Sequence, residues 1–126
     1  MAKRIFISFA IEDETYRDFL VEQSRNQRSP FEFVDMSVKQ PWDDKWKTRC
    51  RIKIKGCDGV IALVSKNTAK ASGQLWEIKC AKEERIPTSG VYINNQDKPY
   101  NLPKEFDRIR VVNWTWDNIK SFIDSI

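Results

Sequence analysis

Residues 58–65 read DGVIALVS, and the five apolar side chains from Val60 to Val64 follow one another without a break. An apolar run of this length is typical of a strand covered on both faces, as in a parallel sheet. A polar loop over residues 66–70 and a predicted helix over residues 72–85, with Ser72 as its N-cap, come next. Parallel sheets bind ligands beyond the carboxyl ends of their strands, so we expect the functional site close to the end of this stretch.

Strands and helices are predicted to alternate on both sides of this stretch. β-Branched and aromatic residues indicate further strands over residues 4–9, 31–35, 89–93 and 109–112. Apolar residues at helical spacing indicate helices over residues 12–25 and from Thr115 to the end of the chain. This alternation predicts an α/β fold of the flavodoxin-like type, a three-layer sandwich with helices on both faces. Its five-stranded, mostly parallel sheet should have the order 2-1-3-4-5, and residues 1–126 should form one domain.

The segment between Pro41 and Gly56 fits two kinds of secondary structure. Its second half alternates apolar and basic residues, as a half-buried strand does. A helix over residues 42–55 would instead align one apolar stripe, made of Trp42, Trp46, Cys50, Ile54 and Cys57. Pro41 suits a helix start and Gly56 a helix end, so we predict the helix. Its basic residues could also form a nucleic-acid surface with the tryptophans stacking on bases, but a solvated helix face is the simpler interpretation.

The composition excludes several classes of protein. Hydrophobic residues make up 40% of the 126 residues and charged residues 32%, which is typical of a folded globular domain. No apolar run is long enough to cross a membrane. The net charge of +4, from 22 basic and 18 acidic residues, is too small to indicate a nucleic-acid partner. Three cysteines without metal-site spacing and the lack of histidine argue against a zinc site and predict free thiols in a reducing, cytoplasmic compartment.

Glu77 is a carboxylate that this topology brings close to the expected crevice. The chain has no glycine pattern for phosphate binding and no histidine, which excludes dehydrogenases, P-loop NTPases and serine or cysteine hydrolases that depend on histidine. A carboxylate alone can stabilise the oxocarbenium-like centre that forms when a good leaving group departs from a ribose. The simpler interpretation is that Glu77 only complements the dipole of the helix in which it lies.

Other side chains are expected around the same crevice. The switch point of the predicted sheet lies between its first and third strands. Residues 8–10 and 65–68 follow these strands and would form the two walls of the crevice. Asp35 would flank it from the end of the second strand, and Trp76 would approach it beside Glu77.

The order and spacing of four motifs resemble those of the TIR domain family. The motifs are RIFISF at residues 4–9 with Asp13, FVD at residues 33–35, GVIALVS at residues 59–65, and Glu77-Ile78. More narrowly, the chain is similar to the TIR-like proteins of the Thoeris anti-phage defence system. Many relatives carry a tryptophan where this chain has Gly73, and the loop after the second strand reads Lys39-Gln40-Pro41-Trp42 in place of the usual Arg-Asp and Pro-Gly elements.

The resemblance implies an enzyme that cleaves the nicotinamide–ribose bond of NAD⁺, which is a substrate and not a cofactor. Active relatives use a glutamate followed by an apolar residue, which corresponds to Glu77 and Ile78. Glu77 would stabilise the ribosyl cation and engage a ribose hydroxyl, and no metal is expected. Trp42 or Trp76 would stack on the substrate. The residues expected to bind NAD⁺ are Ser8, Phe9, Ala10, Asp35, Trp42, Ser65, Asn67 and Trp76.

The resemblance also implies partners. The product would be an ADP-ribose derivative, linear or cyclic, that a downstream effector senses. Relatives commonly need self-association or assembly with another protein, and residues 36–46, with Trp42 and Trp46, are the expected lid or interface. Alternatively, both tryptophans belong to the core of the following helix. Two other functions stay open: a non-catalytic TIR interaction module, and a flavodoxin-like binder of nucleotides or nucleic acid.

Overall fold

One parallel sheet forms the centre of the computed structural model, which describes residues 3–28, 31–96, 98–99 and 101–126. Its strands are β1 (Arg4–Ser8), β2 (Glu32–Val34), β3 (Gly59–Val64), β4 (Thr88–Tyr92) and β5 (Val111–Asn113). All neighbouring strands pair in parallel, and their order is β2-β1-β3-β4-β5. The predicted flavodoxin-like fold and strand order are confirmed.

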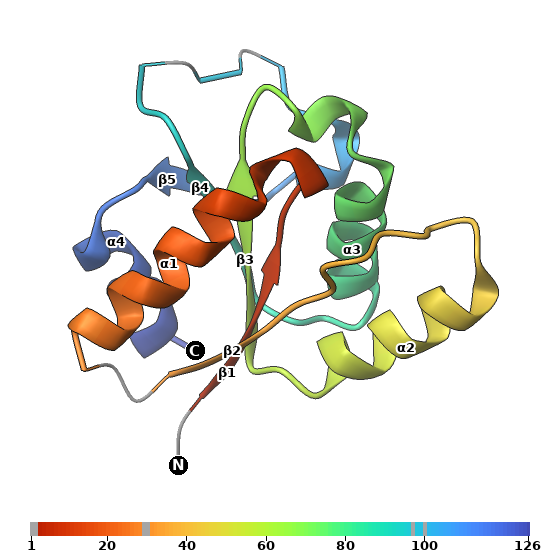
Figure 1. Ribbon diagram of the computed structural model, residues 1–126, viewed down its shortest axis with the longest axis horizontal. Coiled ribbons are helices and arrows are strands. Elements are labelled where there is room, and N and C mark those ends of the chain that lie inside the picture. Colours follow the sequence, from red (N-terminus) through yellow and green to blue (C-terminus); the bar gives the residue numbers. More distant parts are fainter. Residues whose placement is uncertain (1–2, 29–30, 97, 100) are drawn as a thin grey trace.

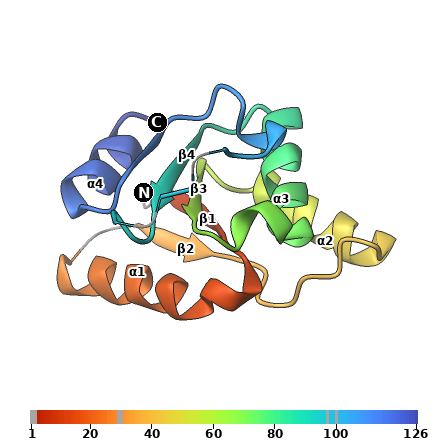
Figure 2. The ribbon, with the colours of Figure 1, turned by 90° about the horizontal axis from the view of Figure 1, so that it is seen from above.

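Two pairs of helices cover the two faces of the sheet (Figures 1 and 2). They are α1 (Glu14–Asn26), α2 (Asp44–Lys55), α3 (Ser72–Glu83) and α4 (Trp116–Asp124). On one face, side chains of α1 and α4 pack with β1, β3 and β4 in a single apolar cluster. On the other face, side chains of α2 and α3 pack against β1 and β3. Every residue of β3 is buried, as its apolar run predicted.

Helix α2 confirms the helical interpretation of the ambiguous segment, but it begins two residues later than predicted. The carboxylate of Asp43 accepts a hydrogen bond of 2.8 Å from the backbone N–H of Lys45, which makes Asp43 the N-cap. Trp42 therefore lies outside the helix, and the predicted stripe holds only from Trp46 onward. Helix α3 begins at Ser72 itself, with Ala71 as an N-cap without a side-chain bond, so the predicted capping role of Ser72 is wrong.

The loops at the carboxyl ends of the strands carry short 3₁₀ turns. These are η1 (Ile11–Asp13) after β1, η2 (Thr68–Lys70) after β3, and η3 (Lys104–Phe106) before β5. Within the described residues, no helix has the length and hydropathy that a membrane-spanning helix requires. The same residues contain no group of three or more cysteine or acidic side chains placed to hold a metal ion.

Candidate functional site

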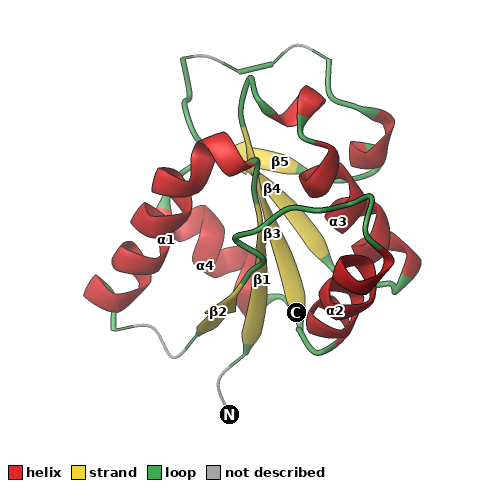
Figure 3. Cartoon of the chain, turned by 45° about the vertical axis from the view of Figure 1, so that its right-hand side comes forward, coloured by secondary structure: helices red, strands yellow, loops and turns green. Residues whose placement is uncertain are grey.

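The chain between β2 and α2, residues 35–43, crosses over helix α3 before it reaches α2 (Figures 1 and 3). We call this segment the strap. It has no regular secondary structure and brings its side chains to the carboxyl end of β1, against the first turns of α3. The strap, the end of β1 and the start of α3 therefore enclose one site.

Glu77 lies at the centre of this site and is fully buried. The hydroxyl of Ser8, the last residue of β1, donates a hydrogen bond of 2.9 Å to its Oε1. The ammonium of Lys39, on the strap, lies 2.7 Å from its Oε2. The thiol of Cys50, on α2, lies 3.9 Å from the same oxygen. Both carboxylate oxygens thus have partners from segments distant in the sequence.

Burial changes the acidity of this carboxyl group. Loss of solvent raises the pKa of Glu77 from 4.5 to about 7, against the opposing effects of the Lys39 charge and of the hydrogen bonds from Lys39 and Ser8. The nearby charge of Asp35 adds to the increase in pKa. Burial, and then the charge of Glu77, also raise the pKa of the Cys50 thiol, which stays protonated. A carboxyl group with a pKa near neutrality can exist in either protonation state at physiological pH.

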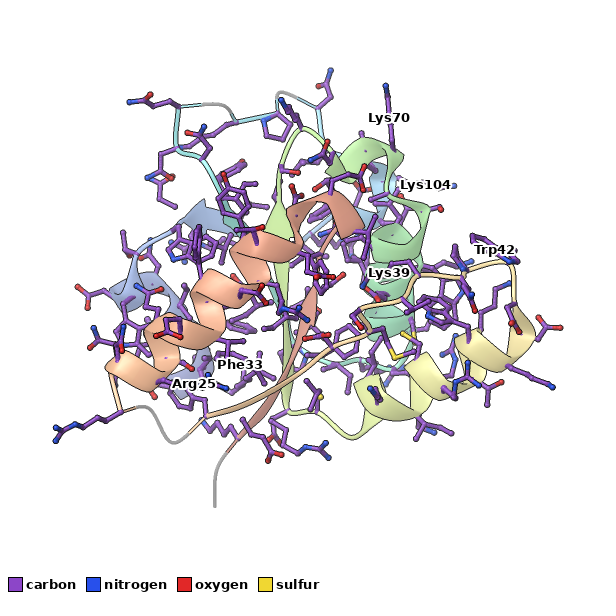
Figure 4. The ribbon with its side chains drawn as sticks, in the orientation of Figure 1. Arg25, Phe33, Lys39, Trp42, Lys70 and Lys104 are labelled. Carbon is purple, nitrogen blue, oxygen red and sulfur yellow. The ribbon has the colours of Figure 1, made fainter. Side chains whose placement is uncertain are left out.

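Lys39 is held by more than its ion pair. Its side chain is only 9% exposed, and its ammonium lies 4.2 Å from the centre of the Phe9 ring, within cation–π range. Gly73 makes room for it, because a Cβ at this position would lie 2.8 Å from the Cβ of Lys39. Figure 4 shows Lys39 where the strap passes α3. Gly73 is therefore what lets the lysine stem pack on α3.

Asp35 is close to the site but has its own partner. The guanidinium of Arg17, on α1, donates 2.9 Å hydrogen bonds to both of its carboxylate oxygens. The same guanidinium lies 5.3 Å from the centre of the Phe9 ring. Asp35 is thus placed as predicted, at the flank, but paired with a cation that the sequence did not indicate.

Ser65 and Asn67 gather around a second carboxylate, that of Asp13. The Ser65 hydroxyl donates to Asp13 Oδ2 at 2.5 Å, and the Asn67 amide donates to Oδ1 at 2.9 Å. This cluster borders a cleft of about 280 Å³ beyond the ends of β3 and β4. The structure therefore places these two predicted residues in a polar cluster of their own, without a contact to Glu77.

A second cleft, of about 180 Å³, lies directly beside the strap. Lys39, Pro41 and Trp42 line one side, Lys70 and the first residues of α3 line the other, and Ala10, Ile11 and Glu12 close it from the end of β1. Trp42 is 76% exposed, and Ala10 is buried. The first turn of α3 has neither a side-chain cap nor an acidic residue, so its amide groups are available to an anion.

Gln74, in the first turn of α3, also lines this cleft and carries an unpaired oxygen. Its amide nitrogen donates to the backbone carbonyls of Ser8 and Leu63, at 3.1 and 2.7 Å. Its Oε1 is the only buried side-chain oxygen or nitrogen without a partner in the described part of the chain. A buried acceptor without a donor costs free energy.

Trp76 does not face this site, which corrects its predicted stacking role. Its ring packs edge-on against Trp46 of α2, with centroids 5.4 Å apart, and Arg51 lies 5.5 Å from its centroid. Successive helix residues point about 100° apart, so Trp76 turns toward α2 while Glu77 turns toward β1. Sequence adjacency to Glu77 was a misleading signal.

Comparisons with known proteins agree with this architecture. The family model described as "Thoeris protein ThsB, TIR-like domain" matches residues 6–98 of the chain. Among solved structures, the crystal structure of a prokaryotic SEFIR domain superposes with a TM-score of 0.58. The superposition covers 98% of this chain and 89% of that chain at 14% sequence identity, which shows a shared fold. No protein with curated annotation matches the sequence significantly.

Proposed function

We propose that this chain, which belongs to the TIR-like domain family of Thoeris protein ThsB, cleaves the nicotinamide–ribose bond of NAD⁺. The observation that carries the proposal is the position of Glu77. It is a buried carboxylate at the carboxyl end of a parallel sheet, in a chain without histidine, next to a cleft. The product would be ADP-ribose or a cyclic derivative of it, released as a signal in anti-phage defence.

The negative charge of Glu77 would stabilise the positive charge that develops on the ribose. When the bond between ribose C1′ and the pyridinium nitrogen breaks, its electron pair goes to nicotinamide, which leaves as a neutral molecule. The positive charge then lies on C1′ and the ring oxygen of the ribose, where an ionised carboxylate stabilises it. Water, or a nucleophilic atom of the same substrate, attacks C1′ and gives up a proton. In this mechanism Glu77 also accepts a hydrogen bond from a ribose hydroxyl.

Groups that line the cleft beside the strap are suited to the parts of a dinucleotide substrate. The open first turn of α3 and the ammonium of Lys70 are suited to phosphate oxygens. The exposed Trp42 offers an aromatic face for a base. These groups border Lys39, which separates them from Glu77.

A non-catalytic interaction module is the second candidate, and one observation favours it. Glu77 is fully buried and already neutralised by Lys39, so in this conformation it could serve only to hold the strap. The exposed Trp42 and Val38 of the strap would then form a surface for assembly with another TIR-like domain. Catalysis requires that the strap move, whereas scaffolding does not.

The decisive experiment compares wild-type protein with Glu77→Gln and Glu83→Gln in NAD⁺. Glu83 is an exposed residue of the same helix, so its variant controls for the change of charge on α3. Released nicotinamide is quantified over a range of protein concentrations, the product is identified by mass spectrometry, and folding is checked by circular dichroism. We expect Glu77→Gln to lower turnover by ~100-fold or more and Glu83→Gln to leave it unchanged. No nicotinamide release by wild type at any concentration, or equal release by Glu77→Gln, would reject the proposal.

A further inference from the structure

Lys39 occupies a place built to hold a cation. Its ammonium is held between the carboxylate of Glu77, at 2.7 Å, and the ring face of Phe9, at 4.2 Å. A carboxylate combined with an aromatic face is the arrangement that recognises organic cations, because charge attraction and the ring quadrupole act together. The site is nearly dry, since Glu77 and Phe9 are both fully buried.

We propose that Lys39 is a tethered substitute for the cationic part of the substrate, and that the pyridinium of NAD⁺ takes its place between Glu77 and Phe9 when the strap opens. This inference rests on the proposed function for the identity of the cation. The cation site itself rests only on the geometry of the three side chains.

The position of Lys39 between Glu77 and the cleft makes this exchange direct. The lysine contacts Glu77 on one side and lines the cleft on the other. A dinucleotide with its phosphates at the start of α3 would extend toward the place that the ammonium now fills. Displacement of Lys39 as the strap opens would therefore join the cleft to the carboxylate.

The exchange also preserves charge. Removal of Lys39 alone would leave a buried carboxylate without a cationic partner, which is strongly unfavourable. A pyridinium carries the same single positive charge, and its flat ring can lie on that of Phe9. After the bond breaks, the charge moves to the ribose, and neutral nicotinamide loses its attraction to the site. The same geometry therefore favours cationic substrates over their reduced, neutral forms and promotes release of the leaving group.

A small number of contacts hold the strap closed. The indole of Trp46 donates a 2.6 Å hydrogen bond to the carbonyl of Val38, and Lys53 donates at 3.1 Å to the carbonyl of Asp35. The stem of Lys39, the residue after Val38, packs on Gly73. The closed form competes with substrate, so the apparent affinity is reduced by the fraction of molecules that are open.

The test measures binding of N-methylnicotinamide, a permanent pyridinium cation, and of neutral nicotinamide, by isothermal titration calorimetry at pH 8.5. The proteins are wild type, Lys39→Met, and Lys45→Met, which alters an exposed lysine of α2 as a matched control. Lys39→Met keeps most of the stem and removes the ammonium. We expect Lys39→Met to bind the cation with an affinity at least about tenfold higher than that of wild type. Its affinity for nicotinamide should not increase. Lys45→Met should bind both ligands as wild type does.

Two further variants test the role of the carboxylate and displace Lys39 in an independent way. Glu77→Gln in the Lys39→Met background should abolish the gain, because the carboxylate is half of the site. Gly73→Ala adds a methyl group against the lysine stem, so it should displace Lys39 and produce the gain with the lysine still present. If Lys39→Met does not fold, Gly73→Ala replaces it as the variant in which cation binding is measured. Equal affinity for the cation in wild type and in the folded variant would overturn the inference.

The outcomes separate this inference from the proposed function. A gain in cation binding without nicotinamide release from NAD⁺ supports the cation site and rejects cleavage. Nicotinamide release at the same rate in wild type and Lys39→Met, with no gain in binding, rejects the tethered cation and leaves cleavage intact. A gain in both supports both.

Discussion

The indole N–H of Trp46 donates a 2.6 Å hydrogen bond to the carbonyl of Val38, the residue before the lysine that pairs with Glu77. Trp46 is 1% exposed, whereas Trp42, four residues earlier, is 76% exposed. The two tryptophans expected to act together therefore differ: Trp46 belongs to the core and anchors the strap, and Trp42 remains on the surface. The core interpretation therefore holds for Trp46, whereas an interface role for Trp42 stays a prediction.

Substitution of Trp46 by phenylalanine should destabilise the fold. The variant keeps an aromatic ring but leaves the Val38 carbonyl without its donor and opens a small void. We expect the free energy of unfolding to fall by about 1–3 kcal/mol, as measured by urea denaturation. Trp42→Phe is the matched control and should stay within about 0.5 kcal/mol of wild type. Equal destabilisation by both variants would contradict the anchoring role of Trp46.

Substitution of Trp42 by alanine should weaken self-association while the fold is retained. Trp42 and Val38 expose apolar surface on the strap, and such clusters mark interfaces. We expect lower oligomer content in sedimentation velocity and a weaker dependence of specific activity on protein concentration. Phe19→Ala, which removes an exposed aromatic residue from α1, is the comparison. If Phe19→Ala abolishes association and Trp42→Ala does not, the interface lies on α1 instead.

Glu77 should make stability depend on pH in an unusual direction. Its pKa is raised from 4.5 to about 7 in the folded protein, with Lys39, Cys50 and Asp35 as the ionisable groups around it. The native state therefore holds a proton that the unfolded state releases between these pH values. The stabilising contribution is complete below pH 4.5 and is lost as the pH rises to about 7.

The measurement compares urea denaturation of wild type and Glu77→Gln from pH 4.5 to 8. The difference in unfolding free energy, wild type minus variant, should fall by up to about 3 kcal/mol across this range. Glu83→Gln provides the comparison for an exposed acid of the same helix. A difference that rises with pH would mean that the ion pair with Lys39 outweighs the effect of burial.

The cysteines should be free and slow to react in the native protein. Cys50, Cys57 and Cys80 are all unpaired and buried, as predicted. Burial raises the pKa of each thiol, to about 11 for Cys57 and for Cys80, so little thiolate exists at neutral pH. Titration with a thiol reagent should detect three reactive thiols in the denatured protein. In the native protein, the rate at which the thiols react should be near zero. A Cys50–Cys57 disulfide in non-reducing mass spectra would contradict this.

Local sequence patterns predicted most of the fold. The apolar run of β3 could lie only in the middle of a parallel sheet, and alternating strands and helices left few topologies to choose from. For α2, the helical stripe from Trp46 to Ile54 proved decisive over the alternating basic pattern, because one face of the segment packs on the sheet while the other meets solvent. Such periodicities depend on neighbours in the chain and are therefore visible in the sequence.

By itself the sequence determined the sheet, its order and the position of Glu77 at the carboxyl ends of the strands. Only the tertiary structure decided what Glu77 contacts. Lys39 is 38 residues away from Glu77 in the chain. A lysine fits beside Glu77 only because Gly73, on α3, leaves space for its stem. The orientation of Trp76 toward α2, the burial of Trp46 and the exposure of Trp42 were also decided only by the tertiary structure. The physical reason is that a carboxylate's partners are fixed by the packing of segments distant in sequence, which no local pattern encodes.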